Sequence, residues 1–147
     1  MKKIITKNEK ETFKFGSTIG KACRGGEVFV LCGDLGAGKT KFLQGLAVGL
    51  GVKSRVNSPT FNILKVYKIK SGSRKNISKI KTFYHIDAYR LKSAQDLINL
   101  GIKEFLNQTD SVAGIEWADK VKKIWPKYAR VIKMRQISEN KREIIYS

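Results

Sequence analysis

The sequence GDLGAGKT at residues 33–40 decides how the rest of the chain is interpreted. It fits the phosphate-loop pattern of a glycine, four residues, a second glycine, a lysine and a serine or threonine. The glycines at positions 33, 36 and 38 allow the backbone to approach an anion and to aim successive N–H groups at phosphate oxygens. Lys39 supplies a positive charge for the β- and γ-phosphates, and Thr40 supplies a hydroxyl for Mg²⁺. The stretch therefore predicts a site for the phosphates of a nucleotide.

The segments on either side of this loop have the composition that such a loop requires. Upstream, VFVLC at residues 28–32 is an unbroken apolar run, which is typical of a strand buried on both faces. A helix that begins near Gly38 adds the positive end of its dipole to the loop. Its apolar residues recur at helical spacing as far as Gly51: Phe42, Leu43, Leu46, Ala47 and Leu50. Strand, loop and helix are thus all predicted.

Length and charge limit the classes of protein to which the chain can belong. Its 147 residues, 41% of them hydrophobic, suit one domain over residues 1–147 with its own core. Thirty Lys and Arg against 12 Asp and Glu give a net charge of +18, which favours polyanionic partners such as nucleic acid. The lysines are spread along the whole chain, however, so a solvated basic surface explains the charge equally well.

Cysteine usage and hydropathy indicate the compartment. The two cysteines, Cys23 and Cys32, do not form a CxxC pair, so we expect them to be reduced core residues. The sequence contains no run of about 18 apolar residues, and its N-terminus lacks the apolar region of a signal peptide. We expect a cytoplasmic protein that does not contact a membrane.

Strands and helices are predicted along the whole chain. The segment SPT at residues 58–60 predicts a rigid elbow, because proline fixes its own φ and restricts the residue before it. The expected fold is α/β: three layers, P-loop NTPase-like, with a mixed, mostly parallel sheet flanked by helices. Before the loop region, we predict a helix from Asn8 to about Cys23. After it, we predict a hairpin of strands 61–69 and 80–86 joined by the basic connection 70–79, and then a helix capped by Ser93 that carries Leu97 to Leu106. The last predicted elements are a strand at 112–115, a short helix at 118–125, and strands 128–137 and 142–146 joined by the turn 138–141.

Two acidic residues stand directly after apolar strands. Asp87 follows one predicted strand and Glu116 follows another. The carboxyl ends of parallel strands form the ligand-binding edge of an α/β sheet, so both carboxylates are candidates for metal binding or for positioning water. The spacing does not decide which of them is nearer the metal. The single histidine, His85, is predicted to be structural, and no arginine outside the loop stands in a motif that marks it as a partner for phosphates.

Five motifs together resemble the bacterial TsaE (YjeE) family over nearly the whole chain. They are GDLGAGKT at 33–40, SPTF at 58–61, HIDAYR at 85–90, LGI at 100–102 and IEW at 115–117. In that family the protein is the ATPase subunit of the machinery that makes threonylcarbamoyladenosine at position 37 of ANN-decoding transfer RNAs.

The resemblance implies a role for particular residues. ATP would be bound by Asp34, Leu35, Gly36, Ala37, Gly38, Lys39 and Thr40 of the loop, by Thr60 of a switch-like segment 58–60, and at its base by Glu9. Mg²⁺ would be held by Thr40 and Glu116. Asp87 and Glu116 would be the catalytic carboxylates.

The resemblance also implies partners and a regulated activity. The expected partner is a heterodimer of a threonylcarbamoyl-transferase subunit and its paralogue, which activates a slow Mg²⁺-dependent ATPase. Transfer RNA would be contacted indirectly or through the basic surface.

Two other functions compete with this interpretation. A small nucleotide kinase shares the phosphate loop, but such kinases need an arginine-bearing lid, and the connection 70–79 is too short to be one. An RNA-binding protein without enzymatic activity would explain the charge of +18. It would not explain the phosphate loop, and the chain lacks the aromatic and basic alternation of an RNP-type sheet.

Overall fold

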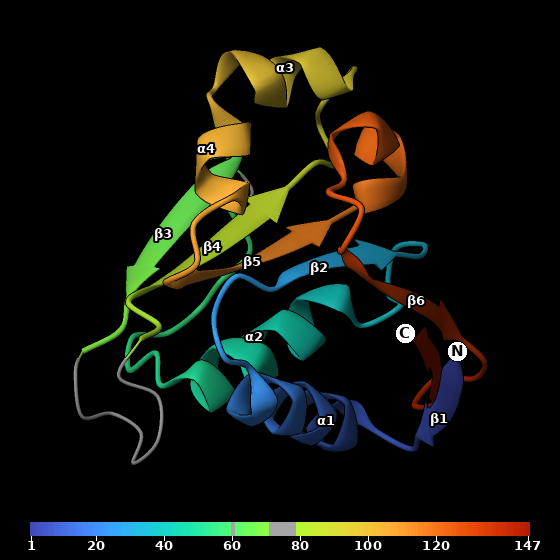
Figure 1. Cartoon of the computed structure of the whole chain (residues 1–147). Coiled ribbons are helices and arrows are strands. Elements are labelled where there is room, and N and C mark those ends of the chain that lie inside the picture. Colours follow the sequence, from blue (N-terminus) through green and yellow to red (C-terminus); the bar gives the residue numbers. More distant parts are fainter. Residues whose placement is uncertain (60, 71–78) are drawn as a thin grey trace.

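The computed structural model describes residues 1–59, 61–70 and 79–147. Its described strands form one seven-stranded sheet in the order β1-β7-β6-β2-β5-β4-β3 (Figure 1). β6, β2, β5 and β4 pair in parallel, whereas β3 and β7 are antiparallel to their neighbours. The sheet is therefore mixed and mostly parallel, as expected. The strands are β1 (Lys2–Thr6), β2 (Val28–Cys32), β3 (Leu64–Lys68), β4 (Thr82–Asp87), β5 (Ser111–Glu116), β6 (Arg130–Gln136) and β7 (Arg142–Tyr146).

Helices cover both faces of the sheet, which confirms the expected three layers. α1 (Glu9–Ala22) and α2 (Lys39–Leu50) lie on one face, and α3 (Ala94–Asn99), α4 (Ile102–Leu106) and the 3₁₀ helix η1 (Ala118–Ile124) lie on the other (Figure 1). Each face has its own apolar core. Phe42, Leu43 and Leu46 of α2 belong to the first core, whereas Leu97 and Ile102 belong to the second. No helix in the described part of the chain is long and apolar enough to cross a membrane.

The structure differs from the expected elements in three places. The strand predicted at 61–69 begins only at Leu64, because the chain bends at residues 61–63. Ile63 still accepts a hydrogen bond from Asp87 N–H, in register with the pairing of β3 and β4. The helix predicted from Ser93 to Leu106 is divided at Gly101, whose φ of +73° ends α3 and begins α4. The short helix after Glu116 is a 3₁₀ helix. Most of the predicted connection 70–79 lies outside the described residues.

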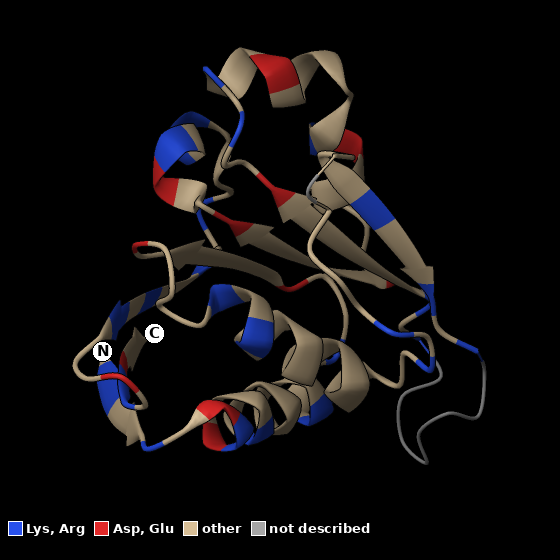
Figure 2. Ribbon diagram, turned by 180° about the vertical axis from the view of Figure 1, so that it is seen from behind, with Lys and Arg blue, Asp and Glu red and all other residues tan. Residues whose placement is uncertain are grey.

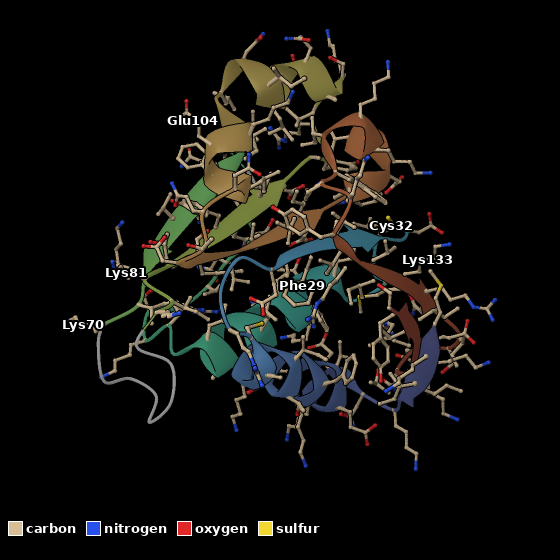
Figure 3. All side chains as sticks on the ribbon, in the orientation of Figure 1. Phe29, Cys32, Lys70, Lys81, Glu104 and Lys133 are labelled. Carbon is tan, nitrogen blue, oxygen red and sulfur yellow. The ribbon has the colours of Figure 1, made fainter. Side chains whose placement is uncertain are left out.

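Basic side chains are distributed over the whole molecule rather than gathered on one element. Lys70 and Lys81 lie at one end of the sheet and Lys133 lies at the other (Figure 3). Figure 2 shows further Lys and Arg residues on α1, α2 and several strands and loops. The positive charge is therefore carried by many elements.

The backbones of α1 and α2 are in direct contact. Glycines on the facing sides of both helices leave no room for side chains: Gly16 and Gly20 on α1, and Gly45 and Gly49 on α2. A Cβ atom added at Gly45 would lie only 2.0 Å from the carbonyl oxygen of Phe13. This contact holds the N-terminus of α1 beside the phosphate loop, where Thr12 lies close to Gly38.

We predict that Gly45→Ala destabilises the protein by about 3 kcal/mol or more, because the new methyl group must push the two helices apart. Intrinsic helix propensity favours alanine over glycine, so a helix with free space at this position would become more stable. Urea denaturation measures the difference in the free energy of unfolding between the variant and the wild type. Val48→Ala, at an exposed position of the same helix, is the control and should change stability by less than about 1 kcal/mol. A Gly45→Ala variant as stable as the wild type would contradict the backbone contact.

Candidate functional site

The site lies at the carboxyl ends of three neighbouring parallel strands. The phosphate loop follows β2, Glu116 ends β5, and Asp87 ends β4. Strand register places Leu31 of β2 opposite Glu116, and Glu116 opposite Asp87. A cleft of about 530 Å³ opens here. The edge at which parallel α/β sheets bind their ligands therefore brings together the loop and both candidate carboxylates.

The conformation of the phosphate loop depends on its glycines. Gly38 has a φ of +94° at the N-cap of α2, and a Cβ atom at Gly33 would lie 2.1 Å from the carbonyl oxygen of Met134. α2 begins directly after Gly38 with its N-terminus at the loop. The loop thus has the backbone that the sequence pattern predicts, joined to a helix whose dipole favours anions.

The side chain of Lys39 lies along the inside of this loop. Its ammonium group donates hydrogen bonds to the carbonyl oxygens of Gly33 and Asp34, at 2.6 and 2.8 Å, and lies 3.8 Å from the centre of the Trp117 ring. Burial lowers the pKa of Lys39, while the nearby carboxylate of Glu116 acts in the opposite direction. A phosphate entering the cleft would be an additional partner that favours the charged ammonium.

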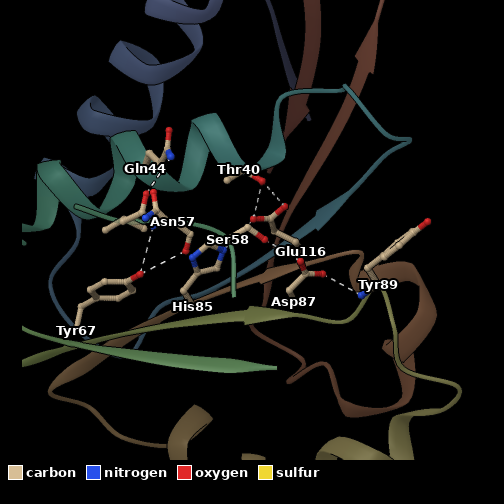
Figure 4. Close-up of polar contacts among 10 residues, drawn as sticks. Thr40, Gln44, Asn57, Ser58, Tyr67, His85, Asp87, Tyr89 and Glu116 are labelled. Atoms are coloured by element: carbon tan, nitrogen blue, oxygen red, sulfur yellow. Dashed lines mark hydrogen bonds and ion pairs between the residues drawn. The ribbon is translucent and has the colours of Figure 1, made fainter. Parts of the chain in front are cut away.

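Thr40, Glu116 and His85 form a buried polar chain (Figure 4). The hydroxyl of Thr40 lies 3.0 and 2.8 Å from the two carboxylate oxygens of Glu116. His85 Nε2 lies 2.8 Å from Glu116 Oε1, and because a carboxylate oxygen only accepts, Nε2 carries the proton. His85 is fully buried, and its Nδ1 has no hydrogen-bond partner among the described residues. His85 therefore fixes the orientation of Glu116, a more specific role than the sequence predicted.

Asp87 is the second carboxylate of the cleft. Its Oδ2 accepts a hydrogen bond from Ser58 Oγ, and its Oδ1 accepts one from Tyr89 N–H, both at 2.9 Å. Asp87 lies opposite Glu116 on the neighbouring strand, and Figure 4 shows the two carboxylates with Ser58 on Asp87. Asp87 thus connects the segment that begins at Ser58 to the carboxyl edge of the sheet.

Most of the residues that sequence reasoning assigned to the site share this cleft. Its lining includes Glu9, Leu35, Gly36, Gly38, Lys39, Thr40, Asp87 and Glu116. Two assigned residues are not part of this lining: Asp34 is exposed, and Ala37 is buried in the core. Thr60 lies outside the described residues. Glu9, at the start of α1, forms an ion pair of 3.3 Å with Lys41.

Sequence reasoning did not identify two residues that touch the phosphate loop. Trp117, whose ring faces Lys39, has a left-handed backbone with a φ of +56°, which is rare for a bulky residue. Arg142, from the first position of β7, donates a hydrogen bond to the carbonyl oxygen of Gly36 at 2.8 Å. The position of Trp117 directly after Glu116 is a sequence signal, whereas no local pattern marks Arg142.

The ligands available for a metal are oxygen atoms. In the described part of the chain no three His, Cys, Asp or Glu side chains cluster as a metal site. The Thr40 hydroxyl and the Glu116 carboxylate nevertheless face each other at the loop. This set fits Mg²⁺, which uses one or two protein oxygens together with water and substrate phosphates, and it does not fit a zinc site.

Comparison with known proteins identifies the family. Residues 6–144 match the family model of the threonylcarbamoyl adenosine biosynthesis protein TsaE. The chain is 36% identical over 142 residues to the tRNA threonylcarbamoyladenosine biosynthesis protein TsaE of Treponema pallidum, covering 97% of each protein. It is 40% identical over 121 residues to that of Borreliella burgdorferi, covering 82% of this chain and 81% of the relative.

A solved structure agrees with these sequence matches. The crystal structure of Bacillus subtilis YdiB superimposes with a TM-score of 0.76 at 31% identity, covering 99% of this chain and 83% of that one. The chain therefore belongs to the TsaE family of proteins that take part in tRNA threonylcarbamoyladenosine biosynthesis.

Proposed function

We propose that the chain is the Mg²⁺-dependent ATPase subunit required for N6-threonylcarbamoyladenosine at adenosine 37 of transfer RNAs that read codons beginning with A. The observation that carries this proposal is the meeting of a phosphate loop with the Thr40 and Glu116 pair in one cleft. Residues 1–147 would act as a single domain in the cytoplasm. The partner would be the threonylcarbamoyl-transferase subunit together with its paralogue.

The proposed position of ATP follows from the charges around the loop. Backbone N–H groups of residues 34–40 and the N-terminus of α2 provide a site for the phosphates. The ammonium group of Lys39 is within the loop and would exchange its carbonyl partners for phosphate oxygens. Glu9 lines the same cleft from the start of α1, in agreement with a contact to the base.

The two carboxylates would have different tasks. Thr40 and Glu116 would hold Mg²⁺, which supplies positive charge for the β- and γ-phosphate oxygens when bound. His85 keeps Glu116 Oε1 in place, so the carboxylate need not reorganise when nucleotide binds. Asp87 is half-buried beside Glu116, with both of its oxygens at the cleft, and would orient the attacking water.

Exposed apolar side chains beside the cleft support regulation by a protein partner. Leu35 at the loop is 82% exposed and Phe61 is 88% exposed, so both side chains are available to a partner that covers this part of the cleft. Phe61 follows the segment whose Ser58 contacts Asp87. Binding of the γ-phosphate would thus be communicated through Asp87 and Ser58 to a surface that a partner contacts.

We predict that Asp87→Ala and Glu116→Ala each reduce ATP hydrolysis by at least about a hundredfold, because each removes a group that positions water or metal. Nucleotide binding should persist in part, since the loop and Lys39 remain. Rates of phosphate release, with ATP affinity from calorimetry, measure both effects. Asp110→Ala removes a half-buried carboxylate that pairs with Lys81, and is the matched control with unchanged activity. Full activity in either cleft variant would exclude that carboxylate from catalysis.

We also predict that the isolated protein hydrolyses ATP slowly and modifies no transfer RNA, because one cleft of this size accommodates a nucleotide and no second substrate. ATPase activity and threonylcarbamoyladenosine formation should be measured with this protein alone, with the partner heterodimer alone, and with both. Mixing should raise the ATPase rate and permit multiple rounds of modification, and Lys39→Ala should abolish both effects.

Three results would contradict the proposal. Multiple turnovers by the heterodimer alone would make this protein dispensable, and an unchanged ATPase rate on mixing would exclude activation by the partner. Transfer of the γ-phosphate to a nucleoside monophosphate, tested with the same preparation, would instead identify a nucleotide kinase.

A further inference from the structure

Arg142 joins the phosphate loop to the hairpin formed by β6 and β7. Its Nε donates to the carbonyl oxygen of Gly36 at 2.8 Å. Its Nη1 donates to three carbonyl oxygens of the turn between these strands, those of Ser138, Glu139 and Lys141, at 3.2, 3.0 and 3.1 Å. Nε and Nη1 of a guanidinium group point in different directions, so this one side chain contacts both the phosphate loop and the hairpin turn. Arg142 and Gly36 are 106 residues apart in the chain.

This contact fixes the peptide group between Gly36 and Ala37. The carbonyl end of that peptide is held by Arg142, and its N–H end donates to the carbonyl oxygen of Asp34 at 3.2 Å. Glycines at 36 and 38, with φ of +79° and +94°, flank a backbone that could otherwise rotate easily. Both ends of one peptide are thus fixed in a loop whose function depends on the direction of its N–H groups.

Lys39 and Arg142 hold different carbonyl groups of the loop. Lys39 donates to Gly33 and Asp34, and its ammonium group is the one that a bound phosphate would attract. Arg142 donates to Gly36 and is anchored by the hairpin turn, so it remains on the loop when Lys39 changes partners. A Gly36 carbonyl without this donor could turn toward the phosphates and repel them.

We propose that Arg142 is a positioning residue that fixes the shape of the phosphate loop for nucleotide phosphates. The inference rests on the proposed function, because it assumes that ATP binds at this loop. Lysine cannot replace Arg142 fully, since one ammonium group cannot reach Gly36 and the hairpin turn with the same fork of donors.

The test compares Arg142→Gln and Arg142→Lys with Arg135→Gln. Arg135 lies on the other strand of the same hairpin and pairs with Glu143 at 2.6 Å rather than with the loop. Affinities for ATP and ADP are measured by calorimetry, and the ATPase rate is measured at saturating ATP. Amide hydrogen exchange over residues 34–38 reports the order of the loop in the unliganded protein.

Arg142→Gln should lower the affinity for both ATP and ADP by about tenfold, which is the effect of losing one charge-assisted hydrogen bond. The saturated rate should change by less than about threefold, and exchange should accelerate at residues 34–38 but not in α2. Arg142→Lys should recover only part of the affinity, and Arg135→Gln should bind as the wild type does. The Lys variant keeps the test valid if the Gln variant does not fold.

Two outcomes would overturn the inference. Unchanged affinity in both Arg142 variants would show that the loop does not need this contact. A lower saturated rate with unchanged affinity would make Arg142 a group that acts on the reacting phosphate rather than on the loop. If the wild type itself did not bind ATP, the proposed function would fail, and the inference with it.

Discussion

The parallel register of β2, β5 and β4 is the constraint on which the rest of the site depends. Leu31 pairs with Glu116, and Glu116 pairs with Asp87. This register sets the distance from the phosphate loop to both carboxylates, although Thr40 and Glu116 are 76 residues apart in the chain. A slip of one residue would turn Glu116 to the opposite face of the sheet and separate it from Thr40. β5 also packs closely against α2, because a side chain at Gly114 of β5 would collide with Leu43 of α2.

Two further contacts hold the loop within this frame. Glycines bring α1 into backbone contact with α2, so that Glu9 and Thr12 reach the cleft. On the other side, Arg142 connects the hairpin of β6 and β7 to Gly36. The proposed nucleotide site is therefore surrounded by elements from the beginning, middle and end of the chain, and each meets the loop through a small number of specific contacts.

The sequence predicted those parts of the site that depend on local pattern. The loop, its strand and its helix follow from glycine spacing and apolar periodicity, and the positions of Asp87 and Glu116 at strand ends follow from the apolar runs before them. The break at Gly101 and the late start of β3 were not predicted, because the break depends on a left-handed glycine and because the alternation of apolar residues does not mark the bend at 61–63. His85 and Arg142 received no role at the site, since their partners lie 31 and 106 residues away.

We infer that Mg²⁺ and ATP bind where Lys39, Thr40 and Glu116 meet. A crystal structure of the protein with Mg²⁺ and a non-hydrolysable ATP analogue tests it most directly. We expect a metal ion about 2.1 Å from Thr40 Oγ1, with Lys39 Nζ moved from the carbonyl oxygens of Gly33 and Asp34 to the phosphates. An analogue bound elsewhere, with the Thr40 to Glu116 and Lys39 to Gly33 hydrogen bonds unchanged, would contradict it.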